Sequence, residues 1–353
     1  MHDRGWDGSR QRLAAKRDCL ASQQAAQASI VQAGSDLEGS GATVHWLDAG
    51  GLRLRAASWP GAGRGTVLLL NGRTEFIEKY IEPVAELRAR GFAVWTFDWR
   101  GQGLSRFART TPAQHETHFT PYLDDLDLIL DSLVLPALRG RPLVLIGHSM
   151  GGHLGAHALA RRPDLYAQAV LLAPMIGLLN RGRRPPPFAG ILTRLACLVP
   201  GQSSRFGPGT QRSFDPARPF ETNRLTQCPD RYAADMALVA ARPELAVGGV
   251  SWGWIGAALR SNRKLFCPAT LARITMPVLV ALAGADTVVD NRPARRFALA
   301  LAHGQLLEIA GARHELLREH DGARNALWSA VDAFLAPVSL AAVQPLSASA
   351  SAT

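Results

Sequence analysis

The residues best suited to chemistry lie in the segment Gly147–Gly151, which reads Gly-His-Ser-Met-Gly and follows a run of aliphatic residues. A serine on a sharp strand-to-helix turn needs glycine two positions before it and two after it, because side chains there would clash. Gly147 and Gly151 occupy these positions. The pattern predicts that Ser149 is a nucleophile and that the amide of Met150, at the start of the helix, stabilises an oxyanion.

A serine nucleophile needs a base, and the base needs a carboxylate that orients it. Two apolar runs, residues 277–283 and 305–309, are followed by loops that contain Asp286 and His314. In a parallel sheet the loops after the strands lie along one edge, where a crevice forms. The order serine, acid, histidine along the chain is also a known order for a catalytic triad. We therefore predict a triad of Ser149, Asp286 and His314.

Other residues compete for these roles. Asp290 lies in the same loop and could replace Asp286, although Asp286 follows the strand more closely. Asp98 also ends an apolar run, but it precedes the serine, and we expect it to anchor the turn at Arg100–Gly101. Five further histidines are expected to pack elsewhere or to lie out of reach of the serine: His148, His153, His157, His303 and His320.

A second oxyanion donor is expected in the loop after the apolar run 66–70. Asn71, Gly72 and Arg73 occupy this loop. The backbone amide of Arg73 is the predicted donor. The alternative is that the loop is only a tight turn that needs Gly72.

The elements that must position these residues alternate between strands and helices. Two short runs, 44–47 and 52–56, predict an antiparallel hairpin. Buried strands are predicted at 66–70, 92–97, 142–146, 169–173, 277–283 and 305–309, and helices at 77–87, from 120, after 149, at 292–302 and at 321–335. Such alternation implies an α/β fold with a mostly parallel central sheet and helices on both faces.

Two of the predicted helices carry local signals. The first has Pro83 inside its apolar pattern, which predicts a kink or a restart. The second begins at Thr120, predicted as N-cap, with Pro121 as its first helical residue. Its buried stripe is predicted to consist of Leu123, Leu126, Ile129, Leu130 and Leu133.

The alternation stops after the strand at 169–173 and resumes only at 277. Between them lie an apolar stretch at 188–199 and helical patterns at 231–241 and 252–260. An insertion of this length predicts a helical lid. The predicted organisation is a poorly ordered leader (1–41), a core (42–174 and 273–336), a lid insertion (175–272) and a disordered tail (337–353).

The composition limits the function classes. The 353 residues are 47% hydrophobic, which is ample for a core, and no run is long enough to cross a membrane. The net charge of +10 comes almost entirely from arginines that are dispersed, apart from the cluster Arg181–Arg184, so we expect no nucleic-acid partner. The four cysteines lack metal spacing and are expected to be free thiols. With no apolar segment behind the basic start, we expect a cytoplasmic protein.

Taken together, the motifs resemble the α/β-hydrolases of the monoglyceride lipase and bacterial lysophospholipase branch, which includes serine aminopeptidase-like hydrolases. The resemblance covers about residues 42–336 and is carried by five motifs: Asn71–Phe76, Asp98–Ser105, Gly147–Gly152, Gly284–Asp286 and His314. It implies the same triad, the same oxyanion donors and the same lid. Many relatives carry His where this chain has Asn71, which leaves the substrate preference open.

The resemblance and the residues together predict cleavage of carboxylic esters of lipid-like substrates through an acyl-enzyme, without a metal or an organic cofactor. The enzyme would be a lysophospholipase or a monoacylglycerol lipase, with the apolar lid stretch in peripheral contact with the inner face of the membrane. The nearest alternative is a short-chain carboxylesterase. An aminopeptidase-like amide hydrolase would need a lid carboxylate to hold the amine, and the candidates are Asp215, Glu221, Asp230 and Asp235. An intact triad argues against a non-catalytic binding module.

Overall fold

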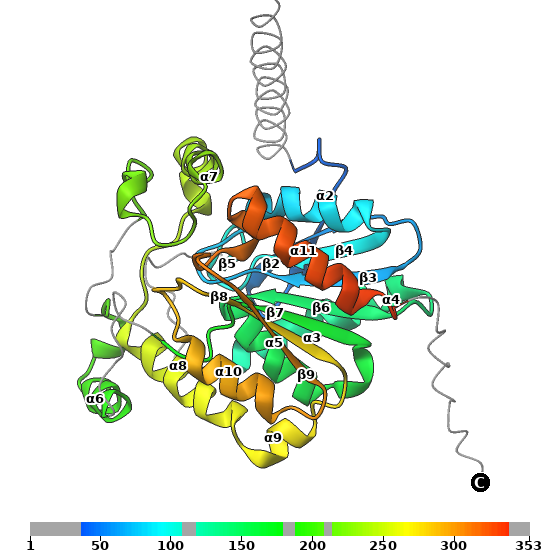
Figure 1. Ribbon diagram of the computed structural model, residues 1–353. Coiled ribbons are helices and arrows are strands. Elements are labelled where there is room, and N and C mark those ends of the chain that lie inside the picture. Colours follow the sequence, from blue (N-terminus) through cyan, green and yellow to red (C-terminus); the bar gives the residue numbers. More distant parts are fainter. Residues whose placement is uncertain (1–36, 108–117, 179–187, 208–213, 339–353) are drawn as a thin grey trace, which may run out of the picture.

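A mostly parallel β-sheet forms the centre of the computed structural model (Figure 1). The structure describes residues 37–107, 118–178, 188–207 and 214–338. Most of the predicted leader, nearly all of the predicted tail and the cluster Arg181–Arg184 lie outside these residues.

Apart from the short β5, which was not predicted, the strands occur where apolar runs predicted them. They are β1 (Thr43–Asp48), β2 (Leu52–Trp59), β3 (Gly65–Leu70), β4 (Phe92–Phe97), β5 (Arg106–Phe107), β6 (Leu143–His148), β7 (Gln168–Leu172), β8 (Val278–Ala283) and β9 (Gly304–Ile309). The order in the sheet is β1-β2-β4-β3-β6-β7-β8-β9, and the short β5 pairs with β2. The hairpin β1–β2 and the pair β2–β4 are antiparallel, and all pairs from β4 to β9 are parallel.

Helices cover both faces of the sheet, as predicted. They are α2 (Ile81–Ala89), α3 (Thr120–Ile129), α4 (Leu135–Leu138), α5 (Met150–Arg161), α6 (Ala189–Ala196), α7 (Pro229–Ala241), α8 (Trp252–Leu265), α9 (Pro268–Ala272), α10 (Asn291–Ala300) and α11 (Asp321–Leu335). Helices α2 and α11 pack on one face, and α3, α5, α8 and α10 pack on the other (Figure 1). The central strands are therefore buried on both sides, which explains their unbroken apolar sequences.

Alternate residues of each central strand enter opposite cores. In β3, Leu68 belongs to the core beneath α3 and α5, whereas Val67 and Leu69 belong to the core beneath α2 and α11. In β6, Leu145 and Ile146 divide in the same way. This period of two fixes the register of the sheet, because a slip by one residue would exchange the two cores.

The start of α3 differs from the prediction. Thr120 is the first helical residue, and the N-cap position belongs to Phe119, which makes no side-chain cap. The ring of Phe119 packs edge-on against Tyr122, with ring centroids 5.4 Å apart. The helix therefore begins without the predicted hydroxyl cap, at a position where an aromatic ring packs against its first turn.

The buried stripe of the same helix is also shorter than predicted. Leu126, Ile129 and Leu130 are buried, but Leu123 and Leu133 are only half-buried. A π-helical turn at Leu130–Val134 interrupts the α-helical period and brings Val134 into the core instead. The extra residue in this turn shifts the face that the following residues present.

The helix that contains Pro83 restarts. A 3₁₀ turn at Ile77–Tyr80 is followed by α2, and Pro83 is the third residue of α2. The first turn of a helix tolerates proline, because its missing N–H would have no partner within the helix. Of the two predicted outcomes, a kink or a restart, the structure shows the restart.

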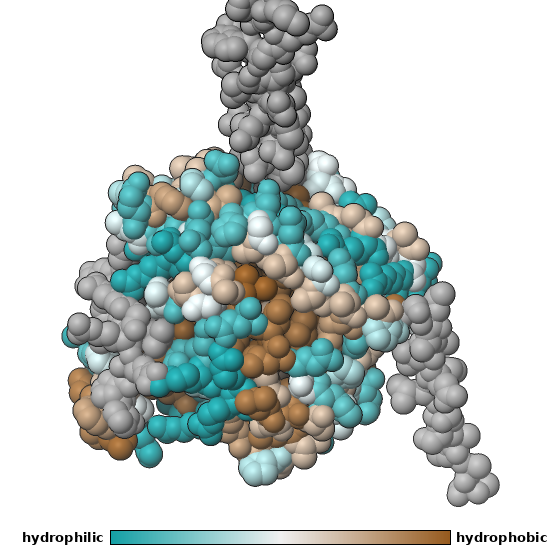
Figure 2. All heavy atoms as spheres, viewed as in Figure 1, coloured by the Kyte–Doolittle hydropathy of each residue, from teal (hydrophilic) through white to brown (hydrophobic). Residues whose placement is uncertain are grey.

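The segment between β7 and β8 contains helices and no strand that joins the sheet, within its described residues. Trp254, Ala257, Ala258 and Leu265 of α8 belong to the core beneath the sheet, so α8 takes the place of a crossover helix. In contrast, α6 packs mainly against α8 and exposes large apolar side chains, which Figure 2 shows as brown atoms at the lower left, where Figure 1 places α6. The extent of the lid, residues 175–272, remains a prediction.

Candidate active site

Ser149 sits in a strained turn between β6 and α5. Its backbone has φ 52° and ψ −114°, a conformation that non-glycine residues rarely adopt. A Cβ atom on Gly147 would lie 2.6 Å from the Gly151 oxygen, and a Cβ on Gly151 would lie 2.3 Å from the Leu70 oxygen. Both glycines are therefore required by close backbone contact, as predicted, and the turn holds the serine at the end of the strand.

The structure brings the three predicted triad residues together. The Ser149 Oγ atom lies 2.9 Å from His314 Nε2, and His314 Nδ1 lies 2.7 Å from Asp286 Oδ2. Ser149, Asp286 and His314 follow β6, β8 and β9 respectively, so the parallel sheet gathers them at one edge. These two contacts connect the predicted nucleophile to its base and the base to a carboxylate, in the geometry that serine catalysis requires.

Asp286 is held as a carboxylate that orients the histidine. Its Oδ1 atom accepts hydrogen bonds from the amides of Val288, at 2.7 Å, and Val289, at 3.0 Å. Burial raises the pKa of Asp286, but the interaction with His314 and the two amides outweighs it, so the pKa lies below its usual value. An ionised Asp286 keeps the proton of His314 on Nδ1, which leaves Nε2 to accept the proton of Ser149.

The two competing carboxylates have other partners. Asp290 caps α10 by accepting from the amide of Arg292, and it forms an ion pair with the Arg292 guanidinium at 2.6 Å. Asp98 is fully buried, pairs with Arg55 at 2.7 Å and accepts from the amide of Leu104 at 2.8 Å. Asp98 therefore anchors the loop after β4, close to the turn at which its role was predicted.

His148 has a closer relation to the site than we predicted. Its ring centroid lies 4.9 Å from that of His314, and its Nε2 atom lies 3.2 Å from the backbone oxygen of His314. Its Nδ1 atom lies 3.1 Å from Glu75 Oε2, which also accepts from the hydroxyl of Tyr80 at 2.6 Å. The hydrogen bonds of the His148 ring are with Glu75, Tyr80 and the His314 backbone, so His148 contacts the loop that carries the predicted triad histidine.

The carboxylate of Glu75 favours the charged form of His148. Burial lowers the pKa of His148, but Glu75 outweighs burial and raises the pKa above its usual value. The imidazolium form donates both N–H groups, one to Glu75 and one to the backbone oxygen of His314. The sequence placed Glu75 and His148 in two separate motifs, 73 residues apart, and did not indicate that they pair.

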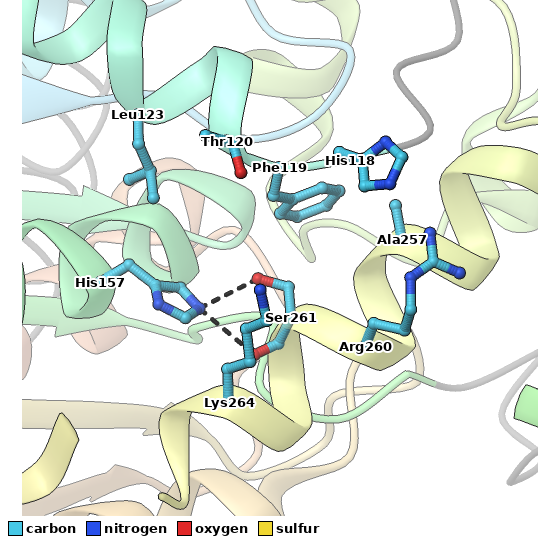
Figure 3. A pocket seen from close by; sticks show the side chains of 9 residues that line it. All are labelled: His118, Phe119, Thr120, Leu123, His157, Ala257, Arg260, Ser261 and Lys264. Atoms are coloured by element: carbon cyan, nitrogen blue, oxygen red, sulfur yellow. Dashed lines mark hydrogen bonds between the residues drawn. The ribbon is translucent and has the colours of Figure 1, made fainter. Parts of the chain in front are cut away.

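The other two histidines near the nucleophile face α8. His153 Nε2 lies 2.7 Å from Ser261 Oγ, and His157 Nε2 lies 2.9 Å from the same oxygen. A pocket of about 280 Å³ opens beside His157 and Ser261, between α3, α5 and α8 (Figure 3). Burial lowers the pKa of both histidines, to about 4 for His157, so both are neutral near pH 7. They pack as predicted: both side chains bind Ser261, and the contact of His153 with Ser149 is a helical hydrogen bond between backbone atoms, at 3.0 Å.

The predicted oxyanion donors lie in two adjacent loops. Met150 is the first residue of α5, so helix formation leaves its amide without an intrahelical acceptor. Leu70 pairs with Gly147 in the sheet, so the loop that begins at Asn71 runs beside the turn of the nucleophile. The indole of Trp99 donates to the Asn71 oxygen at 2.8 Å and fixes this loop. That Arg73 and Met150 bind an oxyanion remains a prediction.

Among the residues that the structure describes, no group of His, Cys, Asp and Glu side chains could hold a metal ion. Cys197, Cys228 and Cys267 are free thiols. No described helix is long and apolar enough to cross a bilayer.

A mostly parallel sheet with a strained serine turn, a histidine and an aspartate at its edge defines the class of α/β-hydrolases. Residues 61–321 match the family described as serine aminopeptidase, S33, and the chain belongs to this family. Lysophospholipase L2 of Escherichia coli K12 is 33% identical over 277 residues, which cover 76% of this chain and 79% of that protein. The human monoglyceride lipase is 23% identical over 285 residues, 80% of this chain and 83% of that protein.

Solved structures show the same fold. A soluble variant of monoglyceride lipase from Saccharomyces cerevisiae, in complex with a substrate analogue, aligns with a TM-score of 0.67 and 21% identity over 84% of this chain and 96% of that chain. The monoacylglycerol lipase of Paleococcus ferrophilus aligns with a TM-score of 0.62. These comparisons confirm the predicted fold class and the predicted resemblance.

Proposed function

We propose that the protein is a serine hydrolase that cleaves carboxylic esters of lipid-like substrates, as a lysophospholipase or a monoacylglycerol lipase. The observation that carries the proposal is the connected arrangement of Ser149, His314 and Asp286, with contacts of 2.9 Å and 2.7 Å. The names of the relatives, lysophospholipase and monoglyceride lipase, support lipid esters as the substrate class.

The proposed reaction has two half-reactions through one acyl-enzyme. The Oγ atom of Ser149 attacks the ester carbonyl while its proton passes to Nε2 of His314, and the amides of Arg73 and Met150 stabilise the oxyanion. The tetrahedral intermediate collapses when the imidazolium of His314 gives this proton to the leaving alcohol. Water then attacks the acyl-enzyme, with His314 again as base, and the fatty acid leaves as Ser149 regains its proton.

The carboxylates of the lid segment support an ester rather than an aminopeptidase substrate. Asp235 is buried, but Arg318 neutralises it at 2.7 Å, and Lys79 lies at 3.5 Å. The three other candidates, Asp215, Glu221 and Asp230, are exposed to solvent. A carboxylate in either situation binds a substrate amine weakly, because its charge is already paired or hydrated.

A substrate panel tests the proposal. Lysophospholipids, monoacylglycerols, p-nitrophenyl esters of short and long acyl chains and aminoacyl amides are compared by kcat/KM. We expect esters with long acyl chains to be the best substrates and amides to be the poorest. A preference confined to short acyl chains would favour the carboxylesterase alternative, and turnover of amides alone would overturn the proposal.

We also propose that the outer surface of α6 and the residues on either side of it contact the lipid interface from which the substrate is drawn. Six large apolar side chains are exposed there: Phe188, Ile191, Leu192, Leu195, Leu198 and Val199. The exposed fraction is 61% for Ile191 and 73% for Leu198. Contact of such apolar surface with water is unfavourable, whereas its insertion at the boundary of the acyl chains is favourable. The predicted place at the inner membrane face belongs to this proposal.

Charged substitutions on this helix test the membrane contact. The double variant Ile191→Asp/Leu195→Asp should bind phosphatidylglycerol vesicles at least about tenfold more weakly than the wild type, because each lost apolar side chain is worth about 1.5–3 kcal/mol when buried. Vesicle flotation measures the bound fraction. The matched control is Leu299→Asp on α10, where an equally large apolar side chain is 75% exposed. Equal binding of both variants would contradict the assignment to α6.

A further inference from the structure

The guanidinium of Arg73 lies in neutral surroundings next to the proposed oxyanion site. Its Nη1 atom donates to Gln102 Oε1 at 3.2 Å, and its Nη2 atom lies 3.4 Å from the backbone oxygens of Gly248 and Gly249. Its Cζ atom lies 5.9 Å from the centre of the Trp254 ring. These partners come from the loop after β4 and from the segment before and within α8, so the guanidinium lies between the core and the lid segment.

Other enclosed arginines of this protein pair with acids. Arg55 binds Glu78 at 2.8 Å and Asp98 at 2.7 Å, and Arg318 binds Glu82 at 3.0 Å and Asp235 at 2.7 Å. Within the described parts of the chain, Arg73 has no carboxylate partner. Burial lowers the pKa of the Arg73 guanidinium, which shows that its cation is poorly compensated.

An arginine that is enclosed without a counter-ion costs free energy in the unliganded protein. This cost is recovered when a ligand brings an anion to the guanidinium. These contacts leave the Nε–H group and one Nη1–H group of Arg73 without an acceptor among the described residues. The two contacts of Nη2 are long, at 3.4 Å, so an anion that replaces one of them can bind two N–H groups of the planar fork. Arg73 is half-buried, so it keeps some contact with solvent, from which an anion can approach.

The position of Arg73 restricts which anion fits. Its backbone amide is the proposed oxyanion donor, so its side chain begins at the reacting carbonyl. The same number of covalent bonds separates the backbone nitrogen of an arginine from its Cζ atom as separates the ester carbonyl carbon of a 1-acyl lysophospholipid from its phosphorus. A substrate whose carbonyl lies at the amide can therefore place its phosphodiester at the guanidinium of the same residue.

We propose that Arg73 binds the phosphodiester of the substrate and makes the enzyme prefer lysophospholipids to uncharged monoacylglycerols. The inference rests on the proposed ester hydrolysis and selects between the two substrate classes named there. Arginine suits this role because its planar fork binds two phosphate oxygens at once, whereas lysine provides a single point charge. The glycerol of a monoacylglycerol offers no anion to the same group.

The test measures, for each protein, the ratio of kcat/KM on two substrates. Arg73→Met and Arg73→Lys are compared with the wild type on lysophosphatidylglycerol and on monoacylglycerol with the same acyl chain. The ratio of the two kcat/KM values cancels any loss that the substitution causes through the backbone amide, because both substrates share that loss. We expect the ratio to fall about ten- to a hundredfold in Arg73→Met, which corresponds to one charge-assisted interaction, and to recover partly in Arg73→Lys.

Two controls separate the possible failures. Arg295→Met removes an exposed arginine of α10 that pairs with Glu308, and its ratio should equal that of the wild type. An unchanged ratio in Arg73→Met, with both substrates turned over, would overturn the role of Arg73 and leave the ester hydrolase intact. A wild type that hydrolyses neither substrate would overturn the proposed function, and this inference with it.

A measurement on the wild type covers the case in which Arg73→Met does not fold. Glycerophosphoglycerol, the deacylated head group, should inhibit hydrolysis of a p-nitrophenyl ester competitively, because its phosphodiester occupies the guanidinium. Glycerol at the same concentration should not inhibit. Equal effects of the two compounds would contradict the proposed phosphodiester site.

Discussion

The Ser149→Ala variant is expected to hydrolyse esters about a million times more slowly than the wild type, since removal of a triad nucleophile leaves only binding and oxyanion stabilisation. The hydroxyl of Ser149 is the group that His314 can deprotonate, at 2.9 Å. Alanine occupies the strained backbone position at φ 52° at about the same cost as serine, so the fold should persist. The readouts are kcat on a p-nitrophenyl ester and covalent labelling by a fluorophosphonate.

Ser261 provides a matched control, because it is also a serine in hydrogen-bond contact with histidines. Its Oγ atom lies 2.7 Å from His153 and 2.9 Å from His157. Ser261 lies inside the ordinary helix α8, with no strained turn at its position. Ser261→Ala should therefore label like the wild type. Labelling that persists in Ser149→Ala and disappears in Ser261→Ala would show that the nucleophile was assigned wrongly.

The features of the site that the sequence could predict are those with local signals. Gly147 and Gly151 flank the serine because backbone atoms approach them closely, and this need is visible in a pentapeptide. Asp286 and His314 could be found because each follows an apolar strand and the topology of a parallel sheet brings such ends together. In each case one physical rule joins the sequence pattern to a position in the fold.

The features of the site that could not be predicted depend on packing between segments that are distant in the sequence. No local pattern indicates that Glu75 binds His148, or that the ring of His148 contacts the loop of His314. That no acid of the described residues lies beside Arg73 is likewise a property of its neighbours in space, Gln102 and the segment between β7 and β8.

The segment between β7 and β8 shows a second limit of hydrophobic patterns. The sequences of α6 and α8 both contain apolar stripes, yet Trp254 of α8 is buried in the core while Ile191 of α6 faces outward. An apolar stripe predicts that a face avoids water. It does not indicate whether the face contacts the core, a substrate or a membrane. For α6, the vesicle experiment tests whether the face contacts a membrane.

The Asp286→Asn variant is expected to lose about 10⁴-fold in kcat with little change in structure. The amide side chain keeps the shape of the carboxylate, but its N–H₂ group donates where the carboxylate accepted, so His314 is left with the wrong tautomer. Nε2 then carries the proton and can no longer accept one from Ser149. The amides of Val288 and Val289 can still bind the remaining side-chain oxygen, which preserves the loop. Steady-state kinetics on a p-nitrophenyl ester and thermal unfolding measure the two properties separately.

Asp290→Asn is the control within the same loop. Asn is about as good an N-cap as Asp, and the ion pair with the half-exposed Arg292 contributes little, so both kcat and stability should stay near those of the wild type. The pair of variants therefore separates the carboxylate that orients His314 from the one that caps α10. A large loss in Asp290→Asn beside a harmless Asp286→Asn would mean that the loop rearranges in solution so that Asp290 reaches the histidine.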